Sequence, residues 1–237
     1  MRVLVVTAVP VERDAVTRAF GGAEEQLPLP GAELHRRGAF DVLAGGAGPA
    51  AAAAATAFAL ASGALASSPY GLVVSAGIGG AFTPVTPLGS LVVADGIVAA
   101  DLGAETAEGF LPVTALGFGR DRFAPPPALV REVAAATGAA TGPVLTVSTV
   151  TGTAERAGAL LAAHPGALAE AMEGFGVAEA AARAGVPVLE VRAVSNAVGP
   201  RDRDAWRIGD ALAALTDAFG ASASVLEGWN SHENLEG

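Results

Sequence analysis

The sequence lacks several residue types that many functional sites require. It contains no cysteine, which excludes disulfide bonds, thiolate nucleophiles and cysteine-based metal sites, and leaves the redox compartment open. It also contains no lysine, so arginine supplies all 14 basic residues against 24 acidic ones. The net charge of −10 argues against nucleic acid as a partner, because phosphate binding needs a basic surface. A small anionic ligand remains compatible, since it needs only one local arginine.

Further absences narrow the class of site. Three histidines, at positions 35, 164 and 232, lie in unrelated contexts without metal-ligand spacing, so no metal site is expected. The segment "GAGPAA" (46–51) matches a relaxed dinucleotide-binding fingerprint, but it lacks the acid that would bind ribose hydroxyls about 20 residues later. We interpret this segment as a tight strand-to-helix turn.

A long uncharged stretch, from Val42 to Ala94, raises the question of a membrane span. Alanine dominates its middle and transfers weakly into lipid, and glycines and prolines divide it, so a buried βαβ unit is the better interpretation. Near the start, the apolar run is followed by Glu12, Arg13 and Asp14 where a signal peptide would have its cleavage site. We therefore expect a cytoplasmic protein without membrane contact.

Apolar segments of strand and helix character alternate along the whole chain. Strands are expected at 2–8, 33–37, 40–45, 71–77, 89–103, 143–149 and 186–195, with loops at 21–31 and 104–124. Helices are expected at 10–20, 49–66, 126–138, 153–164, 168–184 and 204–227. This alternation predicts an α/β fold, a three-layer sandwich with a mixed, mostly parallel central sheet covered on both faces. No linker, repeat or charge block divides residues 1–237, so one domain is expected.

Unusual chemistry gathers at the expected ends of the strands, where ligands of such sheets bind. Glu12 follows the first strand, and the other strand ends read "SAGIGG" (75–80), "STVTGT" (148–153) and "RAVSNAVG" (192–199). In "AMEGFGVAEAAARAG" (171–185), Glu173 stands among small apolar residues at the expected start of a core helix.

Together these motifs resemble the superfamily of purine nucleoside phosphorylases and methylthioadenosine/S-adenosylhomocysteine nucleosidases. The segments "TAVPVERDAV" and "SNAVGPRDRDAW" resemble in particular its futalosine-hydrolysing branch. The resemblance covers nearly the whole chain, and it implies a single α/β sandwich around a mixed, partly closed sheet. It also implies a homo-oligomer that acts on a nucleoside without metal or organic cofactor.

Hydrolysis of an N-ribosidic bond needs a positioned water, a grip on the sugar and stabilisation of charge on the leaving base. Glu12 is the candidate that activates water, and Arg192 the candidate that steers Glu12 or the water. Each has a plain alternative, since Glu12 suits the first turn of a helix and Arg192 suits a structural ion pair. Arg13 beside Glu12 keeps a phosphorylase open as an alternative.

The sugar and the base have candidate partners as well. Glu173 matches the ribose 2′,3′-diol, because a carboxylate accepts two hydrogen bonds, and Met172 offers an apolar floor. A Met-Glu pair on an amphipathic helix is the alternative, which the Gly-x-Gly that follows and the lack of a cation nearby in the sequence weaken. The resemblance implies further contacts with the sugar or the base from Ser75, Ala76, Gly77, Val150, Thr151 and Ser195. Relatives often stack an aromatic on the base, for which the candidates here are Phe82, Phe110 and Phe175, from the same or a neighbouring subunit.

Asn196 is the residue that points to a particular base. Relatives that release adenine end this strand in serine-aspartate, whereas this chain has Ser195-Asn196. An amide donor suits the O6 and N7 acceptors of a 6-oxopurine, and an ionised aspartate would repel O6. A turn cap is the alternative role for Asn196.

The expected activity is therefore hydrolysis of a hypoxanthine nucleoside, futalosine, a step in menaquinone synthesis. Three other functions remain open. The first is a nucleosidase for methylthioadenosine, S-adenosylhomocysteine or aminofutalosine, and the second is a purine nucleoside phosphorylase. The third is a nucleoside-binding protein without catalysis, against which the retention of both Glu12 and Glu173 argues.

Overall fold

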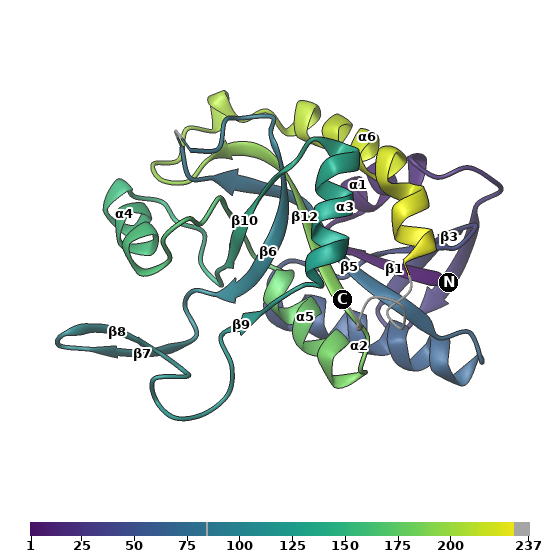
Figure 1. Ribbon diagram of the computed structural model, residues 1–237, viewed down its shortest axis with the longest axis horizontal. Coiled ribbons are helices and arrows are strands. Elements are labelled where there is room, and N and C mark those ends of the chain that lie inside the picture. The colour runs from purple at the N-terminus through teal and green to yellow at the C-terminus, as the bar shows by residue number, and fades with distance from the viewer. Residues whose placement is uncertain (84, 230–237) are drawn as a thin grey trace.

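One mixed sheet runs through the computed structural model, which describes residues 1–83 and 85–229 (Figure 1). Its strands are β1 (Arg2–Thr7), β2 (Glu25–Leu29), β3 (Ala32–Arg37), β4 (Phe40–Ala44), β5 (Tyr70–Ala81), β6 (Leu91–Ala99), β9 (Arg122–Phe123), β10 (Ala140–Thr146), β11 (Ala169–Ala171) and β12 (Val188–Ala197). The order is β11-β10-β6-β12-β5-β1-β4-β3-β2, with β9 on β6. From β10 to β4 every neighbouring pair is parallel except β6 and β12. β11 pairs with β5 as well as β10, which partly closes the sheet.

Helices cover both faces of this sheet and make the three layers (Figure 1). They are α1 (Pro10–Arg18), α2 (Pro49–Leu65), α3 (Pro127–Thr137), α4 (Ala154–Ala163), α5 (Gly174–Arg183) and α6 (Ile208–Gly228). α2 and α5 pack together on one face, and α1, α3 and α6 pack on the other. The predicted three-layer α/β sandwich is confirmed.

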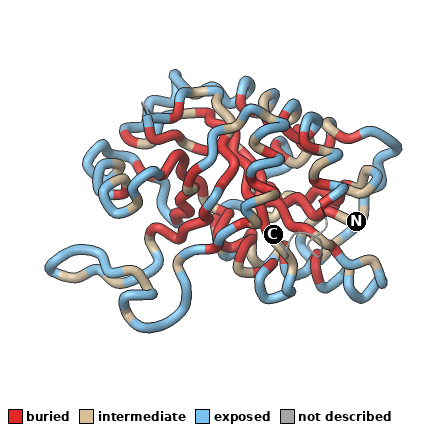
Figure 2. The backbone as a smooth tube through the Cα atoms, viewed as in Figure 1, coloured by how far each residue is buried: buried red, intermediate tan, exposed pale blue. Residues whose placement is uncertain are grey.

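The central strands read as continuous apolar runs because both of their faces are buried. In β1, Leu4 and Val6 join the core on the side of α2 and α5, whereas Val3 and Val5 join the core on the opposite side. Successive side chains of a strand point to opposite faces, so a strand between two helix layers must be apolar at every position. Figure 2 shows this buried centre and, projecting from it, the exposed hairpin of β7 (Gly103–Thr106) and β8 (Gly109–Pro112).

The long uncharged stretch is a βαβ unit, as predicted. α2 buries Ala52, Thr56, Ala59 and Leu60 against the sheet. In the part of the chain that the structure describes, no helix meets the length and hydropathy that a membrane crossing requires.

Four predictions about individual elements are wrong. The expected loop 21–31 contains β2, an edge strand in which Pro28 is tolerated, and the expected loop 104–124 contains β8 and β9. Within the expected helix 168–184, residues 169–171 form β11, and the helix begins only at Gly174. The expected strand 71–77 is longer, because β5 continues to Ala81. A last small difference is a 3-10 turn at Arg203–Ala205, after which α6 begins at Ile208.

Candidate active site

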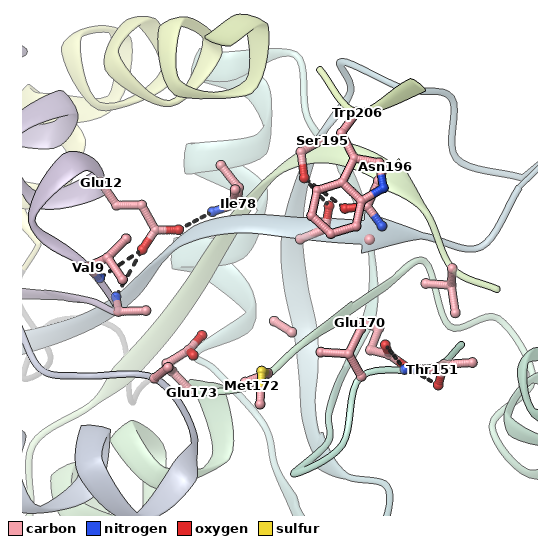
Figure 3. Close-up of a pocket in the computed structure, with 17 residues that line it drawn as sticks. Val9, Glu12, Ile78, Thr151, Glu170, Met172, Glu173, Ser195, Asn196 and Trp206 are labelled. Atoms are coloured by element: carbon pink, nitrogen blue, oxygen red, sulfur yellow. Dashed lines mark hydrogen bonds between the residues drawn. The ribbon is translucent and has the colours of Figure 1, made fainter. Parts of the chain in front are cut away.

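A pocket opens at the carboxyl ends of β1, β5, β10 and β12, and Figure 3 shows the side chains that line it. The lining residues are Ala8, Val9, Glu12, Ala47, Ile78, Gly79, Gly80, Val150, Thr151, Glu170, Ala171, Met172, Glu173, Ser195, Asn196, Val198 and Trp206. Glu12 and Glu173 lie at one end of the pocket, with Met172 beside Glu173 (Figure 3). Asn196, Trp206, Glu170 and Thr151 lie toward the other end.

Glu12 lies in the first turn of α1, and backbone N–H groups hold its carboxylate. Its Oε2 accepts hydrogen bonds from the N–H groups of Ala8 and Val9, at 3.0 and 3.3 Å, and its Oε1 accepts one from Ile78 at 2.9 Å. The carboxylate is 3% exposed, and burial raises its pKa above the ordinary value even though these donors favour the charged form. A carboxylate with a raised pKa that faces a pocket suits a general base.

Gly77 makes room for this carboxylate. A Cβ atom on Gly77 would lie 2.8 Å from Oε1 of Glu12 and 2.8 Å from an Nη1 of Arg192.

Glu173 lies at the start of α5 and joins two elements that are remote in the sequence. Its Oε1 accepts a hydrogen bond from the N–H of Gly48, and its Oε2 accepts one from Arg192, each at 3.2 Å. The Gly-x-Gly that follows permits this arrangement. A Cβ on Gly176 would overlap the backbone of Pro49, and a Cβ on Gly174 would overlap the carboxylate of Glu190. The small residues therefore let α5 approach the start of α2 and bring the Gly48 N–H to Glu173.

Arg192 is fully buried beneath the pocket and holds the carboxylates together. Besides Glu173, its guanidinium donates to Glu190 at 2.9 Å and to the Ser75 hydroxyl at 3.0 Å. Burial disfavours its charge, but the two carboxylates outweigh that effect and hold the pKa of Arg192 above its ordinary value. Burial in turn raises the pKa of Glu190. A cation does lie beside Glu173 in the structure, because the sheet brings Arg192 to it across 19 positions of the sequence.

Ser195 orients the amide of Asn196. The Ser195 hydroxyl donates to Oδ1 of Asn196 at 2.9 Å, and Nδ2 of Asn196 donates to the Ala197 carbonyl, also at 2.9 Å. An amide nitrogen carries two hydrogens, so one donor of Asn196 is left for a ligand.

Trp206 is the aromatic side chain of the pocket. It follows the 3-10 turn, and the guanidinium carbons of Arg201 and Arg203 lie 5.4 and 5.9 Å from its ring centroid. None of the three phenylalanine candidates lines the pocket. Phe82 is buried in a core cluster, Phe175 packs on Phe123, and Phe110 is an exposed residue of β8.

Glu170 presents a third buried carboxylate, at the end of the pocket where Asn196 and Trp206 lie. Its two oxygens accept from the N–H and the hydroxyl of Thr151, at 2.9 and 2.5 Å. The side chain belongs to β11 and is 4% exposed, and burial raises its pKa against the effect of these two hydrogen bonds.

Most of the predicted site residues lie around this one pocket. Glu12, Val150, Thr151, Met172, Glu173, Ser195 and Asn196 all line it. Ser75, Ala76 and Gly77 do not, because β5 continues for four residues beyond Gly77 and Ile78, Gly79 and Gly80 line the pocket instead. Residues 75–77 therefore lie in a strand and do not line the pocket, contrary to the ligand contacts expected of them. Arg192 lies behind the pocket wall and binds Glu173 and not Glu12.

The sequence analysis missed Glu170 and Trp206. An available signal for Trp206 was its position in a polar loop ten residues after Asn196. Glu170 gave no such signal, because residues 168–184 were expected to form one helix.

Arg13 had left a phosphorylase as an alternative function. In the structure it pairs with Asp14 and Glu33 outside the pocket. Of the three histidines, His35 pairs with Glu24 and Glu33, His164 lies beside a different cavity, and His232 lies outside the described residues.

Comparisons with known proteins identify the family of the chain. The model of the phosphorylase superfamily matches residues 9–227. Futalosine hydrolase of Streptomyces coelicolor is 68% identical over 98% of this chain and 100% of its own length, and that of Acidothermus cellulolyticus is 45% identical over 92% and 88%. Among solved structures, the 5′-methylthioadenosine/S-adenosylhomocysteine nucleosidase of Neisseria meningitidis in complex with methylthio-immucillin-A has a TM-score of 0.80. It is 18% identical, over 94% of this chain and 99% of that one, which is a likeness of fold.

Proposed function

Because this chain belongs to the phosphorylase superfamily, and within it to the futalosine hydrolases, we propose that it cleaves the N-ribosidic bond of futalosine with water. The products are hypoxanthine and dehypoxanthine futalosine, and the reaction is a step of menaquinone biosynthesis. The observation that carries the proposal is the pair of buried carboxylates, Glu12 and Glu173, at one end of a pocket whose other end carries Asn196.

Glu12 activates the water in this reaction. The oxygen of the water bonds to C1′ of the ribose as the bond from C1′ to N9 breaks, and Glu12 takes a proton from the water. The raised pKa of Glu12 supports this role, because a stronger base at neutral pH remains ionised and accepts the proton more readily. The carboxylate also disfavours phosphate as the nucleophile, and Arg13 is occupied by Asp14 and Glu33.

Glu173 holds the ribose. Its carboxylate has lone pairs beyond those used by Gly48 and Arg192, and these suit the 2′,3′-diol. Its negative charge also favours the oxocarbenium-like transition state. Arg192 is a positioning residue in this scheme, since it fixes the Glu173 carboxylate without reaching the pocket.

The leaving hypoxanthine occupies the other end of the pocket. The free amide donor of Asn196 stabilises the negative charge that develops on the N7 and O6 side of the base. Trp206 offers the aromatic plane against which the base stacks, and Val150 and Thr151 lie near it. Hypoxanthine then takes up a proton, and the proton on Glu12 returns to solvent.

We also propose a homo-oligomer in the cytoplasm. Four large apolar side chains around the projecting hairpin, Leu102, Phe110, Leu111 and Phe118, are 42% to 64% exposed. An apolar group of this size on a projecting element supports burial against a second copy.

A chromatographic assay tests the activity. Purified enzyme with futalosine should release hypoxanthine and the free sugar, at a rate that added phosphate does not raise. Methylthioadenosine and S-adenosylhomocysteine should be poor substrates. A sugar 1-phosphate that accumulates in phosphate buffer would contradict hydrolysis. Intact futalosine after prolonged incubation would contradict catalysis and favour a nucleoside-binding protein.

A further inference from the structure

Glu170 and Asn196 lie on two strands that flank the same residue of β5. In the sheet register, Glu170 of β11 pairs with Gly80 from one side, and Asn196 of β12 pairs with Gly80 from the other. Residues directly opposite each other on paired strands carry their side chains on one face. The carboxylate and the amide therefore stand on one face, with Cα atoms roughly 10 Å apart, twice the spacing of neighbouring strands.

Gly80 keeps the space between these two side chains open. A Cβ on Gly80 would lie 3.2 Å from Nδ2 of Asn196 and 3.0 Å from a methyl group of Val198. Gly80 itself lines the pocket and lies between the strands that carry the two polar groups.

The Glu170 carboxylate is oriented but still has acceptor capacity. Each of its oxygens accepts one hydrogen bond from Thr151, and a carboxylate oxygen has two lone pairs. Within the described residues no arginine or histidine forms an ion pair with it. A buried carboxylate in this state favours a ligand that brings a hydrogen-bond donor.

We propose that Glu170 accepts the N1–H of the hypoxanthine base and, with Asn196, selects 6-oxopurines over 6-aminopurines. This inference rests on the proposed function and adds a second recognition residue to the same pocket. A 6-oxopurine presents an acceptor at O6 and a donor at N1, which match the Asn196 amide and the Glu170 carboxylate. Adenine presents the reverse pattern, so its N1 lone pair would face the carboxylate and be repelled.

The main test replaces Glu170 with glutamine, which keeps the shape of the side chain. If the glutamine oxygen accepts from the Thr151 N–H, its NH₂ group turns toward the base, so a donor meets the N1–H of hypoxanthine. For Glu170→Gln, kcat/KM for futalosine should fall by about 10- to 100-fold, the usual effect of a lost polar match in a binding site. The ratio of kcat/KM for futalosine over aminofutalosine should fall by at least about tenfold.

The matched control is Glu155→Gln, which removes the same charge from an exposed position in the first turn of α4. It should leave both substrates and the ratio unchanged. A wild-type enzyme that releases no hypoxanthine from futalosine would contradict the proposed function. A wild-type enzyme that does so, together with an unchanged ratio in folded Glu170→Gln, would overturn this inference alone.

A second measurement needs no variant, so it tests the recognition of N1–H even if Glu170→Gln does not fold. Hypoxanthine and 1-deazahypoxanthine have the same size, but the second carries C–H in place of N1–H. As competitive inhibitors of the wild-type enzyme, hypoxanthine should bind at least about tenfold more tightly. Equal inhibition constants would show that nothing accepts from N1 and would overturn the proposal.

Discussion

The carboxylate of Glu12 illustrates how far the chemistry depends on single residues. Glu12→Gln keeps the side-chain volume but removes the base, so kcat should fall by about 100-fold or more, the usual scale for loss of a general base. Because burial raises the pKa of Glu12, the wild-type kcat should rise with pH through a pKa above 4.5 and then level off. The variant should lack this limb. Steady-state kinetics between pH 4 and 9 measures both effects.

A control on the same helix separates this effect from a general change of charge. Asp14→Asn removes a half-exposed carboxylate, which pairs with Arg13 outside the pocket, and should keep kcat and its pH profile. A fully active Glu12→Gln enzyme, or one that keeps the acid limb, would remove Glu12 from the mechanism.

Asn196→Asp tests which base the pocket prefers, by changing the other residue proposed to recognise the base. The two side chains are nearly identical in size, but the aspartate loses a donor and repels O6 unless it is protonated. The ratio of kcat/KM for aminofutalosine over futalosine should rise by about tenfold to several hundredfold, since one good polar match is worth about 1–3 kcal/mol. The melting temperature should stay close to that of the wild type. An unchanged ratio with a large loss of stability would make Asn196 a turn cap.

Several residues of the pocket could be recognised from the sequence because their chemistry is local. Glu12, Glu173 and Asn196 each stand at a strand end or a helix start, where ligands of such sheets bind. The partners themselves were not predictable. Arg192 reaches Glu173, and Glu170 faces Asn196, only through the pairing of strands distant in the sequence.

At the scale of elements, the contact of α2 with α5 depends on a single missing side chain. In Gly176→Ala, the new Cβ would overlap the carbonyl of Pro49, so the two helices must separate and the Gly48 N–H must leave Glu173. Backbone atoms cannot move aside cheaply, and overpacking of this kind typically costs about 1–3 kcal/mol. Chemical denaturation should show that loss in the free energy of unfolding, together with a higher KM for futalosine.

The matched substitution lies in α4. Gly158→Ala places the same methyl group in open space within a helix, where alanine is better than glycine by about 1 kcal/mol. This variant should be as stable as the wild type or more stable, with unchanged kinetics. If Gly176→Ala were equally harmless, the close approach of α5 to Pro49 would not be a requirement of the fold.

The errors in predicting elements share one cause, which is pairing that the local sequence does not encode. β11 reads as part of a helix because alanine and glutamate favour helices, but β10 and β5 supply partners for its backbone groups. β5 was cut short at its glycines, which weaken a strand in isolation, although pairing with β12 carries it to Ala81. This extension moves the floor of the pocket from residues 75–77 to 78–80.

At the scale of the whole molecule, the protein and its substrate carry negative charge and repel each other. The chain carries a net charge of −10, and futalosine carries a carboxylate on its phenyl tail. Two cations nevertheless lie beside the pocket: Arg201 and Arg203 lie over Trp206, which lines it, and both are exposed, while Asp202 and Asp204 alternate with them in the sequence. Guanidinium groups on an aromatic ring are held in position and are well suited to bind a carboxylate.

The paired variant Arg201→Gln/Arg203→Gln tests whether this cluster binds the tail. We expect kcat/KM for futalosine to fall by about tenfold, chiefly through KM, since the tail is remote from the bond that breaks. The methyl ester of futalosine has no tail charge, so its kcat/KM should change by less than about twofold. Arg131→Gln/Arg183→Gln removes the same total charge from α3 and α5 and should leave both substrates unaffected, because neither arginine lines the pocket. Equal losses for futalosine and its ester would instead assign Arg201 and Arg203 to the support of Trp206, the proposed stacking partner of the base.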